Sequence, residues 1–353
     1  MTPKAGIDWE RLPYVAAVAR QAVESGKQPC AVMAIANAKE TLWTEVVSGN
    51  DIVSQDTIFL LASISKPITA CAVMRLVEQG LLLLNRPVAA YLPEFGQSGN
   101  GKQNITTYHL LTHSSGLDET RWAQARLEGK AEMGPCYEEA CRTGLLFEPG
   151  SRTQYNTLSF AVLGELITRL TGQPYPDYLR DQLFAPLGMH DTAFTPPDPA
   201  RAAPVHDFGP PERLQNFMQR AIAGGGLWST AADLVRFGQA LLQGGRSGGY
   251  HLLSPATIEA MTKRHVATTV DWGDGVPVPF NYALGWGKGA HAPGALGSPR
   301  AYDHGGATGT LLWIDPDWNL IFIYLTNTWA DATETARRAL NAVYGALTQE
   351  KPA

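Results

Sequence analysis

The stretch CAVMAIANAKETLWTEVV, residues 30–47, contains two runs of apolar and β-branched residues with a short polar segment between them. The runs Cys30–Ile35 and Leu42–Val47 flank Asn37–Glu40, a pattern that predicts a β-hairpin with a short loop. Before the hairpin, apolar residues recur at helical spacing over Asp8–Gly26. This spacing predicts an amphipathic helix that the aspartate can cap and the glycine can end.

The far end of the chain repeats these elements in reverse order. Gly309–Asp315 and Leu320–Thr326 flank Pro316-Asp317, which predicts a second hairpin. An apolar stripe over Asp331–Thr348 predicts a final helix, with Asp331 as its cap. We therefore expect one antiparallel sheet built from both ends of the chain, with both helices covering the same face.

The middle of the chain has mostly helical periodicity, interrupted by loops rich in Pro and Gly. The predicted fold class is α+β: an antiparallel sheet flanked by N- and C-terminal helices, with a large, mostly helical insertion. Residues 1–85 and 282–353 should form the sheet domain and residues 86–281 the helical domain, with an active site at their interface. The length of 353 residues agrees with a prior of about 150 residues per domain.

Composition excludes several classes of function. Lys plus Arg number 28 against 33 Asp plus Glu, so the net charge is −5, and neither nucleic acid nor an anionic membrane is an expected partner. The chain starts without a secretory signal, and no window reaches about 18 uninterrupted apolar residues, so we expect a cytoplasmic protein. The four cysteines lack zinc-type spacing and are interpreted as reduced thiols. We expect no metal and no organic cofactor.

The first candidate for chemistry is Ser63-Ile64-Ser65-Lys66, which follows an apolar run and opens a predicted helix that ends at Gly80. Three positions apart at a helix start, Ser63 and Lys66 share one face, so the lysine nitrogen can reach the hydroxyl oxygen. Unpaired N–H groups of the first turn favour negative charge there. Serine needs a base to act as a nucleophile. Such a short motif also occurs by chance.

Two further candidates lie far along the chain. Tyr155-Asn156 precedes a predicted helix, where a tyrosine is otherwise a packing residue with a hydrated hydroxyl. His304-Gly305-Gly306-Ala307 leads into the second hairpin, and its glycines allow a ligand to approach the backbone closely. The alternative interpretation is a simple turn into the hairpin.

Together the three motifs resemble the serine β-lactamase and penicillin-binding-protein superfamily. The resemblance covers about residues 8–344 and is closest to the class C branch, which includes D-peptidases, amidases and family VIII carboxylesterases. Further matching segments are residues 62–67, 91–93, 109–117, 148–150, 224–227 and 313–316.

The resemblance implies a role for each matching residue. Ser63 would form an acyl-enzyme, and Lys66 would help to deprotonate it. Tyr155 would be the base or proton shuttle that also serves the leaving group, and it is best treated as a coupled pair with Lys66. The N–H groups of Ser63 and Ala307 would form an oxyanion hole. His304 takes the place that many relatives give to a lysine.

Two departures from the superfamily pattern favour an esterase. Thr157 stands where lactam- and peptide-processing relatives carry an Asn that holds a substrate amide. His304-Gly305-Gly306 replaces Lys-Thr-Gly, which removes a cation and a hydroxyl that usually meet a β-lactam carboxylate. We therefore predict a hydrolase acting on small to medium carboxylic esters, with a small-molecule ester as its partner. A β-lactamase, a D-amino-acid peptidase or amidase, an acyltransferase and a non-catalytic binding protein remain alternatives.

Other sequence features have simpler interpretations. Gly245-Arg246-Ser247-Gly248-Gly249 matches a nucleophile elbow but follows a helical pattern where that elbow needs a strand. His109 and His113 are expected to pack and cap at a helix end rather than bind a metal. Four aromatic residues are candidates to wall the substrate pocket or to fill the core: Trp228, Trp272, Trp286 and Tyr302.

Overall fold

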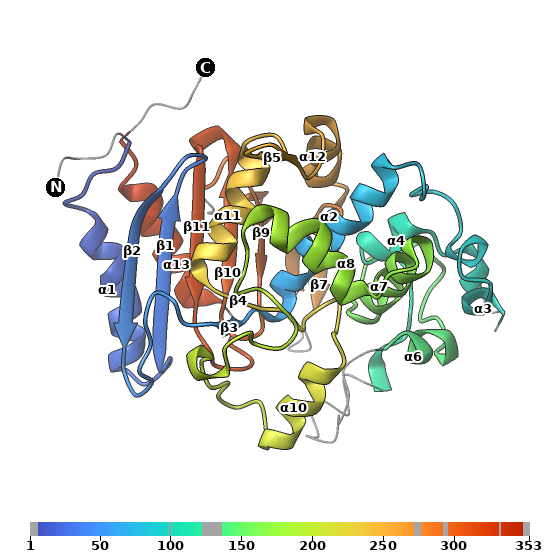
Figure 1. The fold of residues 1–353 in the computed structure, drawn as a ribbon, viewed down its shortest axis with the longest axis horizontal. Helices are drawn as coiled ribbons and strands as arrows, with labels where there is room; N and C mark the ends of the chain where they lie inside the picture. The colour runs from blue at the N-terminus through green and yellow to red at the C-terminus, as the bar shows by residue number, and fades with distance from the viewer. Residues whose placement is uncertain are drawn as a thin grey trace.

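A five-stranded antiparallel sheet in the order β2-β1-β11-β10-β9 occupies one half of the protein, on the left in Figure 1. The computed structural model describes residues 6–97, 99, 101–121, 136–271, 277–291, 296–331 and 333–348. Both predicted hairpins are present, and strands from the two ends of the chain pair through β1 and β11. The α+β prediction is confirmed. The sheet strands are β1 (Cys30–Ala36), β2 (Thr41–Ser48), β9 (Tyr302–Gly305), β10 (Leu311–Asp315) and β11 (Leu320–Leu325).

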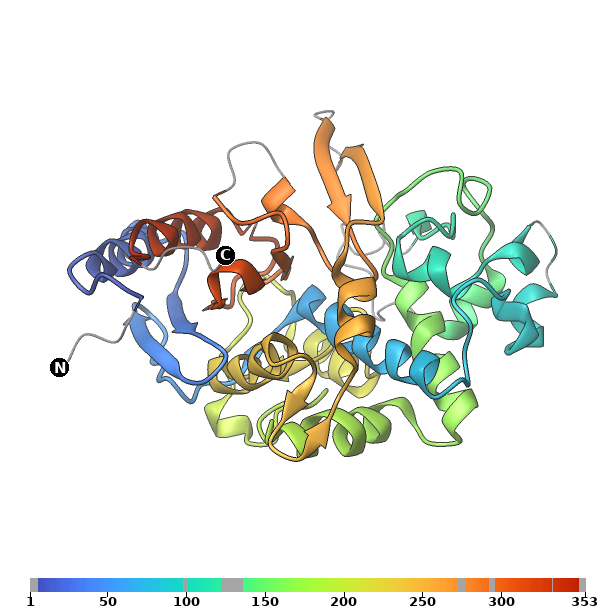
Figure 2. The ribbon, with the colours of Figure 1, turned by 90° about the horizontal axis from the view of Figure 1, so that it is seen from above.

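The central strands explain why the sheet is covered on both faces. Every residue of β1 and β11 is buried, because their side chains are apolar on both sides of the sheet. Most residues of β2, at the edge, are exposed or half-buried. Helices α1 (Leu12–Glu24) and α13 (Glu334–Gly345) lie side by side and pack in one core with β1, β10 and β11 (Figure 2).

The opposite face of the sheet is covered by α11 (Ala231–Leu242). Gly238 of this helix lies against the side chain of Ile321 in β11. The helix therefore comes from the middle of the chain, within residues 86–281, yet contacts the sheet. The division into two domains stays a prediction.

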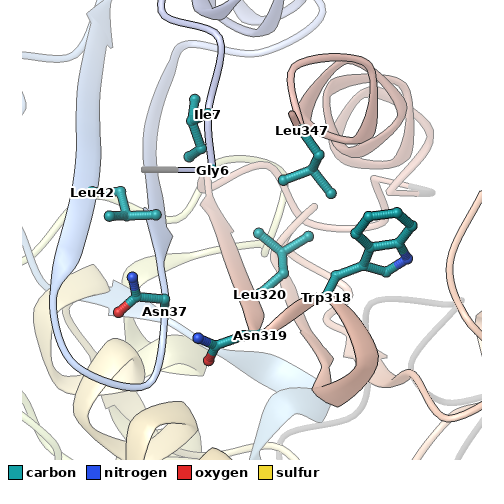
Figure 3. A pocket seen from close by; sticks show the side chains of 8 residues that line it. All are labelled: Gly6, Ile7, Asn37, Leu42, Trp318, Asn319, Leu320 and Leu347. Carbon is teal, nitrogen blue, oxygen red and sulfur yellow. The ribbon is translucent and has the colours of Figure 1, made fainter. Parts of the chain in front are cut away.

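The first and last described segments meet beside the sheet. The Asp8 N–H donates to the Ala346 carbonyl at 2.7 Å, and the Ile7 backbone bridges to Leu347. A small pocket lies between these ends and the two hairpin turns (Figure 3). Neither Asp8 nor Asp331 caps its helix, contrary to the prediction. Asp8 accepts from the Glu10 N–H before α1 begins. Asp331 accepts from the Thr333 N–H, and Thr333 precedes α13.

The remaining elements build the helical part and the rim of the site. A short 3₁₀ turn, η1 (Ala62–Ile64), leads into α2 (Ser65–Glu78), which is buried along nearly its whole length. The predicted helix before Gly172 is α7 (Leu158–Thr171). The other helices are α3 (Pro93–Gly96), α4 (Thr107–Leu111), α6 (Tyr137–Arg142), α8 (Tyr175–Leu179), α9 (Ala185–Leu187), α10 (Pro211–Gln219) and α12 (Pro255–Thr262). The other strands are β3 (Phe59–Leu60), β4 (Trp228–Ser229), β5 (Arg246–Ser247), β6 (Tyr250–His251), β7 (Val266–Asp271) and β8 (Pro277–Tyr282).

All four cysteines are free thiols, as predicted. Among the helices of the described residues, none has the length and apolar character needed to cross a lipid bilayer.

Candidate active site

Ser63 lies on the turn between β3 and α2, and the helix begins two residues later than predicted. Ala62, just before it, has φ +47°, a left-handed conformation that residues other than glycine rarely adopt. The Ser65 hydroxyl stabilises this turn: it donates to the Ala62 carbonyl at 2.8 Å and accepts from the Leu227 N–H at 3.1 Å. The strained turn leaves Ser63 partly exposed while its neighbours are buried.

Lys66 lies beneath Ser63 with its side chain fully buried. Its Nζ is 3.1 Å from the Ser63 Oγ and donates to the Gly224 carbonyl at 2.7 Å. The same nitrogen lies 4.7 Å from the centre of the Tyr155 ring and 5.5 Å from that of Phe160. The structure therefore brings together Ser63, Lys66 and Tyr155, which the sequence places on two distant segments.

Tyr155 lies in the segment that enters α7, and this segment is tightly held. The Asn156 side chain donates to the Leu117 carbonyl at 2.7 Å and accepts from the Ser159 N–H at 2.8 Å. The Glu119 carboxylate accepts from the Thr157 and Leu158 N–H groups at 2.7 and 3.1 Å, at the positive end of the helix. The Thr157 methyl group packs against the Gly224 backbone.

His304 on β9 is buried and neutral. Its Nδ1 lies 2.7 Å from the Gly305 carbonyl, which can only accept, so Nδ1 carries the proton. Nε2 therefore accepts from the Tyr282 hydroxyl at 2.9 Å. Burial, with a further effect of the nearby Lys66, lowers the pKa of His304 to about 4. At neutral pH this position therefore offers no positive charge.

Gly305, Gly306 and Ala307 lie where β9 leaves the sheet, close to the turn that carries Ser63. A Cβ on Gly306 would lie 2.3 Å from the Leu61 carbonyl oxygen, so this close approach requires glycine. Thr308 and Thr310 donate their hydroxyls to the carbonyls of Leu60 and Leu61 at 2.7 and 3.1 Å.

These contacts fix the β9–β10 loop to the segment that presents Ser63. Among the described residues, the Ala307 N–H makes no hydrogen bond to a backbone carbonyl. It is thus available to an anionic oxygen, as an oxyanion hole requires.

An open cavity of about 740 Å³ extends from Tyr155 and His304 along the β7–β8 hairpin. Val278, Pro279 and Phe280 give it an apolar wall, and the Asp303–Arg337 ion pair, at 3.1 Å, lies at its rim. Lys288 also lines it, and burial lowers the pKa of this lysine to about 8.

Trp286 does not line this cavity. Its indole is fully buried in the core between Phe237 and Tyr302, at centroid distances of 6.1 and 4.9 Å. Trp228 and Tyr302 are likewise buried. Trp272 lies outside the described residues. The apolar wall of the cavity comes instead from the β7–β8 hairpin.

Four residues join the site without having been singled out as site residues in the sequence: His113, Glu119, Gly224 and Tyr282. His113 and Gly224 lie in two of the segments that carry the resemblance, residues 109–117 and 224–227, but the sequence does not show what either residue contacts. Glu119 and Tyr282 lie outside these segments, and a lone glutamate or tyrosine gives no spacing to interpret.

The simpler interpretations hold for the remaining motifs. Ser247 lies in the short β5–β6 hairpin, away from any strand-to-helix elbow. His109 caps α4, since its Nδ1 accepts from the Thr106 N–H at 3.3 Å. Within the described ranges, no three His, Cys, Asp or Glu side chains are grouped to hold a metal ion.

Known proteins are similar to this chain over most of its length. Esterase EstB of Burkholderia gladioli is 30% identical over 326 residues, covering 78% of each chain. Protein Rv1367c of Mycobacterium tuberculosis is 27% identical over 369 residues, covering 91% of each.

Solved structures share the fold. EstCE1, a hydrolase with promiscuous acyltransferase activity, superposes with a TM-score of 0.77 at 24% identity, covering 95% of this chain and 99% of its own. A family VIII carboxylesterase superposes with a TM-score of 0.75 at 21% identity, covering 96% and 98%. The family model described as Beta-lactamase matches residues 15–346. The chain therefore belongs to the β-lactamase family.

Proposed function

We propose that this protein is a serine hydrolase that cleaves small to medium carboxylic esters through an acyl-enzyme on Ser63. The observation that carries the proposal is the 3.1 Å separation of the Lys66 Nζ and the Ser63 Oγ, with the Tyr155 ring 4.7 Å from the same nitrogen. A nucleophile within hydrogen-bond reach of a base, with a second proton carrier beside it, is the arrangement that acyl transfer requires.

The reaction proceeds in two balanced steps. The Ser63 oxygen loses its proton to the Lys66–Tyr155 pair and attacks the ester carbonyl, and the N–H groups of Ser63 and Ala307 stabilise the resulting oxyanion. Each such donor contributes about 3 kcal/mol to the transition state. The ester bond breaks as the alcohol takes a proton from Tyr155. Water then gives a proton to the same pair and attacks the acyl-enzyme. The pair returns this proton to the Ser63 oxygen as the acyl bond breaks and the acid leaves.

Several features support an ester rather than a lactam or peptide. His304 and Tyr282 form a neutral pair where relatives present a cation to the carboxylate of a lactam. The Thr157 methyl group packs on Gly224, where an Asn would offer an amide to the substrate. The apolar wall from Val278 to Phe280 suits an alkyl or aromatic group. The similarity to esterase EstB agrees with this choice.

Acyl transfer to an alcohol or amine is the second candidate reaction. The cavity beside Tyr155 is open to solvent and large enough to admit an acceptor other than water. The fold is shared with EstCE1, a hydrolase with promiscuous acyltransferase activity. Adding an alcohol to the assay and measuring the ratio of new ester to free acid distinguishes the two reactions.

The proposal is tested with a chromogenic short-chain ester and a chromogenic cephalosporin, supplied separately. Turnover and intact mass are followed for the wild-type protein and for Ser63→Ala. Ester turnover with a transient adduct on Ser63, and its loss in the variant, is the expected result. A Ser63→Ala protein with more than a few per cent of wild-type turnover would contradict the mechanism. Faster turnover of the cephalosporin would show that the protein acts on amide bonds, as a β-lactamase, peptidase or amidase does. No turnover of either substrate would favour a binding protein.

A further inference from the structure

His113, just after α4, lies directly against Tyr155. Its side chain is fully buried, and its ring centre lies 4.4 Å from that of Tyr155. The rings of Tyr282, at 4.7 Å, and Phe160, at 5.6 Å, also lie close to the imidazole. The histidine therefore forms part of the wall that supports the phenol.

Both residues that flank Tyr155 are bound by His113. The Gln154 N–H donates to the His113 carbonyl at 2.9 Å, and the Asn156 N–H donates to its Nδ1 at 3.1 Å. One residue can make both bonds because its φ is +58°, which turns the chain sharply after α4. The backbone on each side of the tyrosine is thus fixed by a single partner.

The protonation of His113 suits this role. Because Nδ1 accepts a hydrogen bond, the ring proton is on Nε2, which has no acceptor among the described residues. Burial, together with Lys66, holds the pKa of His113 well below its usual range, so the Nδ1 lone pair stays available. A buried N–H without an acceptor is unfavourable, and a phenylalanine would avoid it. The feature that phenylalanine lacks is the acceptor for Asn156.

We propose that His113 is a positioning residue that holds Tyr155 at its distance from Lys66, by binding the backbone on both sides of the tyrosine and supporting its ring. The inference rests on the proposed function, in which Tyr155 transfers protons. It predicts a loss in kcat with little change in KM, since His113 does not line the cavity that the substrate enters.

Two variants, both of which can adopt the left-handed φ of His113, provide the test. His113→Asn accepts a left-handed φ and can place its Oδ1 near the position of Nδ1, whereas His113→Gly accepts the same φ without an acceptor. His109→Asn, at the start of the same helical segment, is the matched control. Each is assayed with the chromogenic short-chain ester, and each is checked for its melting temperature.

His113→Gly should lower kcat by about 100-fold, with KM within about threefold of the wild-type value. The kcat of His113→Asn should stay within about tenfold of the wild-type value. The kcat and KM of His109→Asn should be unchanged. A folded His113→Gly with wild-type kcat would overturn the inference. So would a His113→Asn with a wild-type melting temperature and a kcat about 100-fold below that of the wild type, and this outcome decides even if the glycine variant does not fold. Tyr155→Phe separates the two proposals: if it keeps wild-type turnover, the proposed function fails, and if it alone is inactive, the positioning role fails.

Discussion

Burial, with a further effect of the nearby Lys66, lowers the pKa of both histidines of the site and keeps them uncharged at neutral pH. His304 gives its Nδ1 proton to the Gly305 carbonyl and accepts from Tyr282, so both ring nitrogens are already occupied when a substrate arrives. Such a group shapes the site without taking part in proton transfer at neutral pH. Proton transfer is therefore left to the Lys66–Tyr155 pair, as the proposed function requires.

The neutral His304 makes stability depend on pH. The folded protein leaves it unprotonated down to a pKa of about 4, against 6.5 for an ordinary histidine. Between these values the unfolded chain binds the extra proton, so the free energy of unfolding should fall as pH drops from 6.5 toward 4, by about 3 kcal/mol for His304 alone. Urea unfolding at pH 7, 6 and 5 measures it. His304→Gln should show a smaller fall over the same range, and an identical fall would contradict the assignment.

At the scale of elements, the site depends on the close approach of the β9–β10 loop to the β3–η1 turn. Gly306 makes the approach possible, and Thr308 and Thr310 hold it with hydrogen bonds to the β3 side. The two proposed oxyanion donors come from these two segments, one from each. Their separation is therefore set by packing between elements and not by the local sequence.

Gly306→Ala should disrupt this approach. The added Cβ would lie 2.1 Å from the Thr310 Oγ1 and 2.3 Å from the Leu61 carbonyl oxygen. A shift of the loop by about 1 Å would lower ester turnover about 100-fold. Gly249→Ala is the control, because a Cβ there meets nothing within 4 Å. Steady-state turnover of both variants is the measurement, and a folded Gly306→Ala with wild-type turnover would show that the approach is not needed.

The β7–β8 hairpin should determine which alcohols leave well. The departing oxygen must reach Tyr155 to take its proton, and the apolar wall with Phe280 begins beside that tyrosine. Phe280→Ala should lower kcat/KM about tenfold for esters of long or aromatic alcohols. The methyl ester of the same acid should be nearly unaffected and serves as the internal control. An equal loss for both esters would mean that the variant disturbs Tyr155 or Tyr282 instead.

Elements with a strong local pattern were predictable from the sequence, and contacts between elements were not. The two hairpins and α7 follow from apolar runs and turn residues. The packing of α11 on the sheet does not, because helical periodicity shows which face is buried but not against which partner. The contact of Ser63 with Lys66 could be predicted from their spacing at a helix start, whereas Tyr155 was singled out only through the family resemblance. Tyr282 could not, since its role arises only when the hairpin meets β9.

At the scale of the whole molecule, strands from the N-terminal and C-terminal parts of the chain join to form one sheet. β1 pairs with β11 in a register that sets Val32 opposite Leu325. The helices next to these strands in the sequence, α1 before β1 and α13 after β11, cover one face of the sheet together. The last described residues, through Leu347 and Thr348, bond back to Gly6 and Ile7.

Truncation after Gly345 should weaken this closure without touching the site. It removes the Ala346 carbonyl that accepts from Asp8 and the Leu347 backbone that pairs with Ile7. The melting temperature should fall by about 5 °C, while ester turnover at 25 °C stays at the wild-type level. Thermal unfolding and a turnover assay on the same sample measure both. Loss of turnover in the folded truncated protein would show that the closure reaches the site.

The pairing of β1 with β11 also has a consequence for the order in which the protein is made. A ribosome produces Ser63 and Lys66 early, but β9, β10 and β11 emerge only near the end of synthesis. Until then β1 has β2 as its only sheet neighbour, and one edge of a strand whose residues are all apolar stays unpaired. An unfinished chain therefore carries the serine without its facing loop, and its unpaired apolar strand edge is of the kind that makes folding intermediates prone to aggregate.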